Sequence, residues 1–120
     1  MLEKKIINIA VHGVGTIGKR HLMAMNENQN VNLSGIIDIS DEAKQFCDNK
    51  NIPIYENLID LRKKSEIDGV ILSTPTILHY ENTLAALKLG LDVLIEKPIS
   101  ADVSEAQIIA KVEKKIIVRF

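Results

Sequence analysis

The hydrophobic residues of the chain fall into six short runs, separated by longer segments whose hydrophobic positions recur with a helical period. The runs are Ile6 to Val11, Leu33 to Asp38, Ile54 to Tyr55, Gly69 to Ser73, Asp92 to Glu96 and Ile116 to Arg119. Several are continuous rather than alternating, as in 70–72 and 93–95, which is typical of strands covered by helices on both faces. The pattern therefore predicts an α/β fold: a doubly wound parallel sheet of about six strands in a single domain.

Capping residues mark where the predicted helices begin and end. Thr16 is placed to begin the first helix, and Ser40 precedes Asp41 and Glu42, whose charges suit the positive end of a helix. Gly90 follows a helical pattern and can take the left-handed conformation that ends many helices. Because the strands are parallel, the segments that follow them meet at one edge of the sheet, where ligands bind in such folds.

Composition narrows the function classes. A chain of 120 residues with 46% hydrophobic content can bury one core, and its net charge of -1 does not fit a nucleic-acid binder. Charges interrupt every apolar run, and the amino terminus lacks signal-peptide features, so we expect no membrane segment and a cytoplasmic location. The single cysteine, Cys47, is predicted to be a buried core thiol. The three histidines show no metal-ligand spacing, so no metal site is predicted.

A glycine-rich segment directly follows the first hydrophobic run. Gly13, Gly15 and Gly18 have the spacing of a dinucleotide-binding turn, with Thr16 and Ile17 at the start of the following helix. In such a turn the first glycine permits a sharp bend, the second lets the backbone approach a pyrophosphate, and the third allows close packing of helix on strand. The segment Gly13 to Gly18 is therefore a candidate phosphate-binding loop.

Asp38 lies twenty positions after Gly18, at the end of the second hydrophobic run. A carboxylate there can accept hydrogen bonds from both hydroxyls of an adenosine ribose and repels a 2′-phosphate. The next residue, Ile39, offers no cation for such a phosphate. This favours NAD as the cofactor, with NADP less favoured, and the alternative is a solvated acid at a strand end.

Two further loops fall at the same edge of the sheet. Ser73, Thr74 and Pro75 end the fourth run, where they can contact a dinucleotide or simply cap the next helix. His79 follows this loop and either points to the nicotinamide end or only begins a helix. Glu96, Lys97 and Pro98 end the fifth run, an unusual place for an ammonium group without a partner or ligand. Lys97 is the candidate catalytic residue, able to share a substrate proton, and its alternative is a surface lysine paired with Glu96 or another acid.

The two remaining histidines are less informative. His12 directly precedes Gly13, and we interpret it as a near-core histidine rather than a catalytic one. His21 lies four residues after Ile17 on the first predicted helix, so it either packs there or faces the crevice.

Taken together, the glycine segment from Ala10 to His21, the Ser73 to Thr76 loop with His79, and above all the triplet from Glu96 to Pro98 resemble a known family. It is the glucose-fructose oxidoreductase, inositol dehydrogenase and rhizopine catabolism (Gfo/Idh/MocA) family, and the resemblance covers nearly the whole chain. It implies an NAD(P)-binding Rossmann domain, with Lys97 touching substrate near the nicotinamide and a cis peptide bond between Lys97 and Pro98.

The resemblance also implies a second, substrate-binding domain that these 120 residues do not contain. The leading hypothesis is therefore the cofactor-binding domain of an oxidoreductase that moves a hydride from a sugar, cyclitol or related hydroxyl compound. Alone, it is expected to bind cofactor without turnover, because a small-molecule substrate needs the second domain. The alternatives are a non-catalytic module that associates with itself or another chain, or a truncated remnant.

Overall fold

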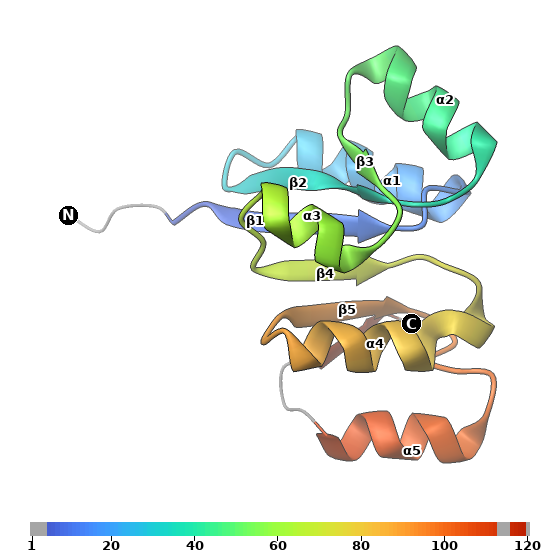
Figure 1. Ribbon diagram of the computed structural model, residues 1–120. Helices are drawn as coiled ribbons and strands as arrows, with labels where there is room; N and C mark the ends of the chain where they lie inside the picture. Colours follow the sequence, from blue (N-terminus) through green and yellow to red (C-terminus); the bar gives the residue numbers. More distant parts are fainter. Residues whose placement is uncertain (1–4, 113–115, 120) are drawn as a thin grey trace.

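The computed structural model describes residues 5–112 and 116–119, and these form one α/β domain (Figure 1). Strands and helices alternate along nearly the whole chain. In order, they are β1 (Ile7–His12), α1 (Thr16–Asn26), β2 (Val31–Ile37), α2 (Asp41–Lys50), β3 (Ile54–Tyr55), α3 (Leu58–Lys64), β4 (Gly69–Leu72), the 3-10 turn η1 (Thr76–Leu78), α4 (His79–Lys88), β5 (Asp92–Glu96), α5 (Val103–Val112) and β6 (Ile116–Arg119).

The strands form a parallel sheet in the order β3-β2-β1-β4-β5-β6. From β1 the chain builds outward through β2 to β3, and then crosses to β4 on the other side of β1. The order of the strands therefore reverses between β1 and β4, and in doubly wound sheets the ligand crevice lies at this reversal. The predicted doubly wound parallel sheet is confirmed.

Two hydrophobic clusters cover the two faces of the sheet. The neighbouring residues Ile36 and Ile37 on β2 are fully buried but belong to different clusters, because successive strand residues point to opposite faces. Ile36 packs with Ala43 and Cys47 of α2, whereas Ile37 belongs to the larger cluster that includes Leu61 of α3. Helices thus cover both faces, and Figure 1 shows α3 and α4 in front of the sheet with α1 behind it.

The helix boundaries follow the predicted capping residues. Helix α1 begins at Thr16, and the Ser40 hydroxyl accepts a hydrogen bond from the Ala43 amide at 3.1 Å, which caps α2. Gly90 has a φ of 75° just beyond α4, as expected for a glycine that ends a helix. Cys47 is fully buried, as predicted, and burial followed by the negative charge of Asp38 raises the pKa of its thiol.

Within the described residues, no helix combines the length and the apolar character needed to cross a bilayer. Among the described residues, no group of three or more His, Cys, Asp or Glu side chains is arranged to hold a metal ion.

Candidate functional site

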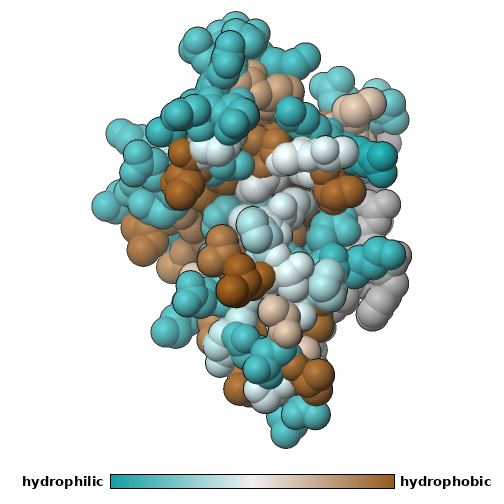
Figure 2. Space-filling model, turned by 90° about the vertical axis from the view of Figure 1, so that its right-hand side faces the viewer, coloured by the Kyte–Doolittle hydropathy of each residue, from teal (hydrophilic) through white to brown (hydrophobic). Residues whose placement is uncertain are grey.

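A cleft of about 980 Å³ lies at the carboxyl ends of β1, β2 and β4 and extends between the start of α3 and one side of α4. Figure 2, which faces this end of the sheet, shows a band of residues of intermediate hydropathy with hydrophobic residues on both sides. The volume lies within the range of small-molecule sites. Six of the predicted cofactor-binding residues line the cleft, namely Gly13, Gly15, Asp38, Ser73, Thr74 and Pro75.

Two glycines of the candidate loop are required by backbone contacts. Gly13 has a φ of 93°, and a Cβ there would lie 2.8 Å from the carbonyl group of Ser73. A Cβ on Gly18 would overlap the carbonyl oxygen of Gly13, because α1 packs directly on the loop. Both positions therefore exclude any larger residue, as the motif predicts.

Gly15 differs from the other two because no atom lies within 4 Å of the position its Cβ would take. It is the residue before α1, which has no side-chain cap and no acidic residue in its first turn. By contrast, the Ser40 hydroxyl caps α2, and Asp41 and Glu42 lie in its first turn. The amide groups that begin α1, at Thr16, Ile17 and Gly18, are thus left for an anion, which a helix N-terminus favours.

The carboxylate of Asp38 joins the glycine loop to the start of α2. One oxygen accepts a hydrogen bond from the Val14 amide and the other from the Ser40 amide, each at 2.9 Å. Burial, the largest single influence, acts to raise the pKa of Asp38, but the hydrogen bonds from Ser40 and Val14 together hold it below its usual value. The Ser40 hydroxyl and the Ile39 amide act on the same carboxylate and lower its pKa further.

His12 also lines the cleft, at the end of β1 and on the same face of the sheet as the buried Ala10. Burial lowers the pKa of His12 from 6.5 to about 4, although the negative charge of Asp38 opposes the shift. The ring is therefore neutral at pH 7, in agreement with its interpretation as a near-core histidine.

The low pKa of His12 makes stability depend on pH. Between about pH 4 and pH 6.5 the unfolded chain binds a proton at this position that the folded chain does not. Above about pH 6.5, His12 is expected to add no pH dependence to the free energy of unfolding. As the pH falls below this value, the free energy of unfolding should decrease by up to ~1.4 kcal/mol per pH unit because of this residue. Urea unfolding at about pH 7 and about pH 5 measures the loss, which His12→Asn should reduce. An equal loss in the variant would assign it to other groups.

The loop after β4 also lines the cleft, and in the sheet it lies on the other side of β1 from Asp38 and Ile39. The Thr74 hydroxyl accepts a hydrogen bond from the side-chain amide of Asn82 on α4 at 3.2 Å, which leaves its own O–H to donate elsewhere. The Ser73 hydroxyl is buried and has no partner among the described residues. Neither hydroxyl caps η1 or α4, so the capping role considered for them is not observed.

The loop after β5 holds the candidate catalytic lysine. One carboxylate oxygen of Glu96 lies 2.5 Å from Nε2 of His21 on α1, and His21 is buried, so its ring packs within the protein. Lys97 is exposed, and no ion pair joins it to Glu96 or to any other acid in the described part of the chain. The peptide bond between Lys97 and Pro98 is cis, as the resemblance implied.

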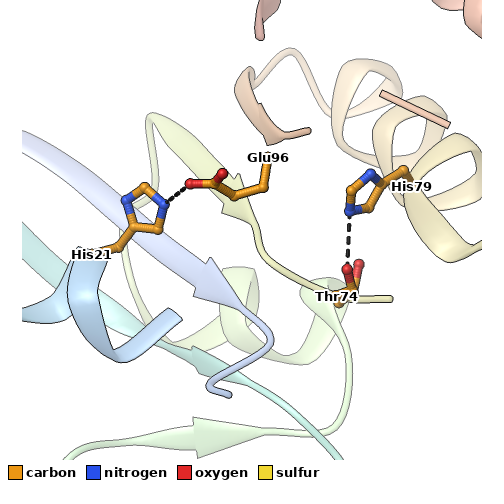
Figure 3. Close-up of polar contacts among 4 residues, drawn as sticks. All are labelled: His21, Thr74, His79 and Glu96. Carbon is orange, nitrogen blue, oxygen red and sulfur yellow. Dashed lines mark hydrogen bonds and ion pairs between the residues drawn. The ribbon is translucent and has the colours of Figure 1, made fainter. Parts of the chain in front are cut away.

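His79 begins α4 but does not line the cleft. Its ring is buried, with Nδ1 2.9 Å from the carbonyl oxygen of Pro98 and Nε2 3.0 Å from that of Thr74 (Figure 3). The ring therefore lies between the loops that follow β4 and β5 rather than pointing toward the cleft. Direct contact of His79 with a cofactor stays a prediction, whereas its contacts with the two loops are observed.

Comparison with known proteins shows to which family the chain belongs. A family model described as an oxidoreductase family with an NAD-binding Rossmann fold, GFO_IDH_MocA, matches residues 7–120. The chain belongs to this family. The fold class and the NAD-binding character predicted from the sequence are thus confirmed.

Two curated members of the Gfo/Idh/MocA family illustrate the similarity. Glucose-6-phosphate 3-dehydrogenase from Bacillus subtilis is 32% identical over 112 residues, which are 92% of this chain and 31% of the relative. Inositol 2-dehydrogenase/D-chiro-inositol 3-dehydrogenase from Lactiplantibacillus plantarum is 29% identical, with 97% of this chain and 34% of the relative covered. The chain thus spans about a third of the length of the curated relatives it matches.

Solved structures give the same picture. Myo-inositol 2-dehydrogenase from Lactobacillus plantarum superposes with a TM-score of 0.84 at 28% identity, over 96% of this chain and 36% of that one. The WlbA dehydrogenase from Chromobacterium violaceum, solved with NADH and UDP-GlcNAcA, gives a TM-score of 0.85 at 25% identity, over 99% of this chain and 36% of that one.

Proposed function

We propose that this domain binds NAD in the cleft at the carboxyl ends of the strands, as the cofactor-holding part of a sugar or cyclitol dehydrogenase. The observation that carries the proposal is the start of α1. Gly15 leaves open space beside the first amide groups of α1. These amides are bound by no side-chain cap, and the first turn of the helix contains no acidic residue. A pyrophosphate has the charge and size for this position, because it accepts several hydrogen bonds and is favoured by the helix dipole.

The other residues at the edge of the sheet fit the remaining parts of a dinucleotide. The Asp38 carboxylate lines the cleft, where it can accept hydrogen bonds from the adenosine ribose, and the exposed Ile39 beside it offers an apolar surface for a base. Thr74 lines the same cleft, and its hydroxyl can still donate a hydrogen bond. In this arrangement the nicotinamide extends toward the loop of Lys97, with the cis bond to Pro98 beyond it.

The proposed reaction is the oxidation of a secondary alcohol to a ketone. Bound NAD supplies the hydride acceptor, while the chain supplies position and charge. The Lys97 amino group, which has no competing acid partner among the described residues, would bind the substrate hydroxyl and take up its proton, while the hydride of the carbinol carbon would pass to the nicotinamide. The relatives include inositol and glucose-6-phosphate dehydrogenases, which supports a polyol substrate. Because those relatives are about three times longer, further substrate contacts are expected from parts that this chain does not include.

Titration of the domain with NADH tests the cofactor site. The chain has no tryptophan, so the fluorescence of NADH can be followed with little interference from the protein. We expect saturable enhancement with NADH, and weaker binding of NADPH because the Asp38 carboxylate repels a 2′-phosphate. The absence of a response to millimolar NADH would refute the proposed site. Self-association of the domain stays a separate prediction, which light scattering measures.

A further inference from the structure

Two buried histidines hold the loop that carries Lys97. His21 comes from α1 and contacts the Glu96 carboxylate, whereas His79 comes from α4 and contacts the carbonyl oxygens of Pro98 and Thr74. Figure 3 shows the two rings on either side of Glu96, whose carboxylate reaches toward His21. The residues immediately before and after Lys97 are thus each bound to a different helix.

These contacts tie together segments that are far apart in the sequence. His21 and Glu96 are separated by 75 positions, and His79 and Pro98 by 19. The His21 and His79 rings are only 8% and 1% exposed, so water has little access to replace the lost partners when a contact breaks. A buried polar group without a partner is costly, which favours a single position of the loop.

The surroundings of His79 add a constraint on its orientation. Both oxygens near its ring are backbone carbonyls, which can only accept hydrogen bonds from the ring nitrogens, and a half turn of the ring would put ring carbons in the place of both nitrogens. By its position, the same ring also fixes the spacing between the Thr74 loop and the Pro98 loop. The first of these loops lines the cleft, and the second carries the candidate catalytic lysine.

We propose that His21 and His79 are positioning residues, which hold the backbone of Lys97 at a fixed place beside the nicotinamide end of the cleft. The Lys97 side chain is exposed, whereas its backbone is restrained from both sides. This inference rests on the proposed function for the role of Lys97, but the restraint itself is a property of the domain. A restrained backbone lowers the entropy lost when a flexible amine is ordered against substrate.

Backbone 15N relaxation of the domain tests the restraint directly. In the wild type, Lys97 and Ile99 are expected to have order parameters of about 0.85, typical of rigid backbone, falling below about 0.6 in His21→Leu and His79→Leu. Gln retains a side-chain donor, so His21→Gln and His79→Gln should recover part of the rigidity. Thr83→Ala is the matched control, since Thr83 is fully buried in the same helix as His79 and its hydroxyl bonds neither loop.

The outcomes separate positioning from general destabilisation. The proposal is supported if the loop is mobile in the leucine variants and Lys97 stays rigid in Thr83→Ala. This comparison requires that Thr83→Ala has the same melting temperature as the leucine variants. Wild-type order parameters at Lys97 and Ile99 in both leucine variants overturn it, as does equal mobility in Thr83→Ala. An NADH titration of the wild type runs in parallel, so failure of cofactor binding is recorded separately from failure of the restraint.

Discussion

Replacing Asp38 with alanine is expected to weaken NADH binding by about 3 kcal/mol, on the order of a hundredfold in Kd. Two ribose hydroxyls would lose a charged acceptor, and hydrogen bonds to charged groups contribute roughly 1.5 to 3 kcal/mol each. The structure adds a second cause, because the same carboxylate accepts hydrogen bonds from the Val14 and Ser40 amides. Its removal therefore loosens the glycine loop that would bind the pyrophosphate. Fluorescence titration with NADH measures the change.

Two further variants separate the ribose contacts from the loss of local structure. Asp38→Asn keeps the shape and one acceptor oxygen, so an intermediate affinity is expected. Ser40→Ala removes the hydroxyl that caps α2 and also acts on the Asp38 carboxylate, at a cost of about 1 kcal/mol, but leaves that carboxylate and the Ser40 amide bound to it. Its NADH affinity should match the wild type. Unchanged affinity in Asp38→Ala would show that the ribose is held elsewhere.

The fold was predictable from sequence because its signals are local. Continuous apolar runs such as Val70-Ile71-Leu72 identify strands covered on both faces, and Ser40 and Gly90 mark helix ends through contacts within a few residues. The predicted strand ends differ from the observed ones by one or two residues at Ile6, Val11, Leu33, Asp38 and Ser73. Ends of elements depend on the last hydrogen bond of the ladder, which a residue pattern does not determine.

Parts of the site could be predicted from the sequence where a single structural requirement explains the type of residue. Gly13 and Gly18 are glycines because backbone atoms occupy the place of a side chain, and Asp38 ends a strand beside the loop that its spacing implied. The contacts of His21 with Glu96, and of Asn82 with Thr74, were not predicted. They join separate elements through side chains, and no single-sequence spacing encodes which rotamers meet across a sheet. The helical position of His21 left packing and crevice equally open for the same reason.

Sequence also left the role of His79 open, and the contacts of its ring explain why. A histidine at the first position of a helix has the same local pattern whether it faces a ligand or the protein interior. Here the deciding groups are two carbonyl oxygens, one of them on a loop 19 residues further along the chain. Only the arrangement of β4 beside β5 brings both loops to the ring.

Alanine substitutions at the three glycines of the loop are expected to differ in effect: those at Gly13 and Gly18 should lower stability, and the one at Gly15 should lower NADH affinity. Gly18→Ala places a methyl group against the Gly13 carbonyl, and we expect a loss of about 3 kcal/mol in the free energy of unfolding, since neither backbone segment can move freely. Gly13→Ala should be similarly destabilising, because its φ of 93° and the nearby Ser73 backbone both oppose a side chain. Urea unfolding followed by circular dichroism measures both.

Gly15→Ala is the informative counterpart, because the folded domain has room for the added methyl group and a backbone conformation that alanine accepts. Stability should stay within about 0.5 kcal/mol of the wild type, whereas NADH affinity should fall at least ~tenfold, since the methyl group occupies the space of the pyrophosphate. Gly90→Ala serves as a control outside the glycine loop, since Gly90 does not line the cleft: its φ of 75° should cost about 1 kcal/mol of stability and leave NADH affinity unchanged. If Gly15→Ala binds NADH like the wild type, the open space beside α1 is not where the phosphates lie, and the observation that carries the proposed function fails with it.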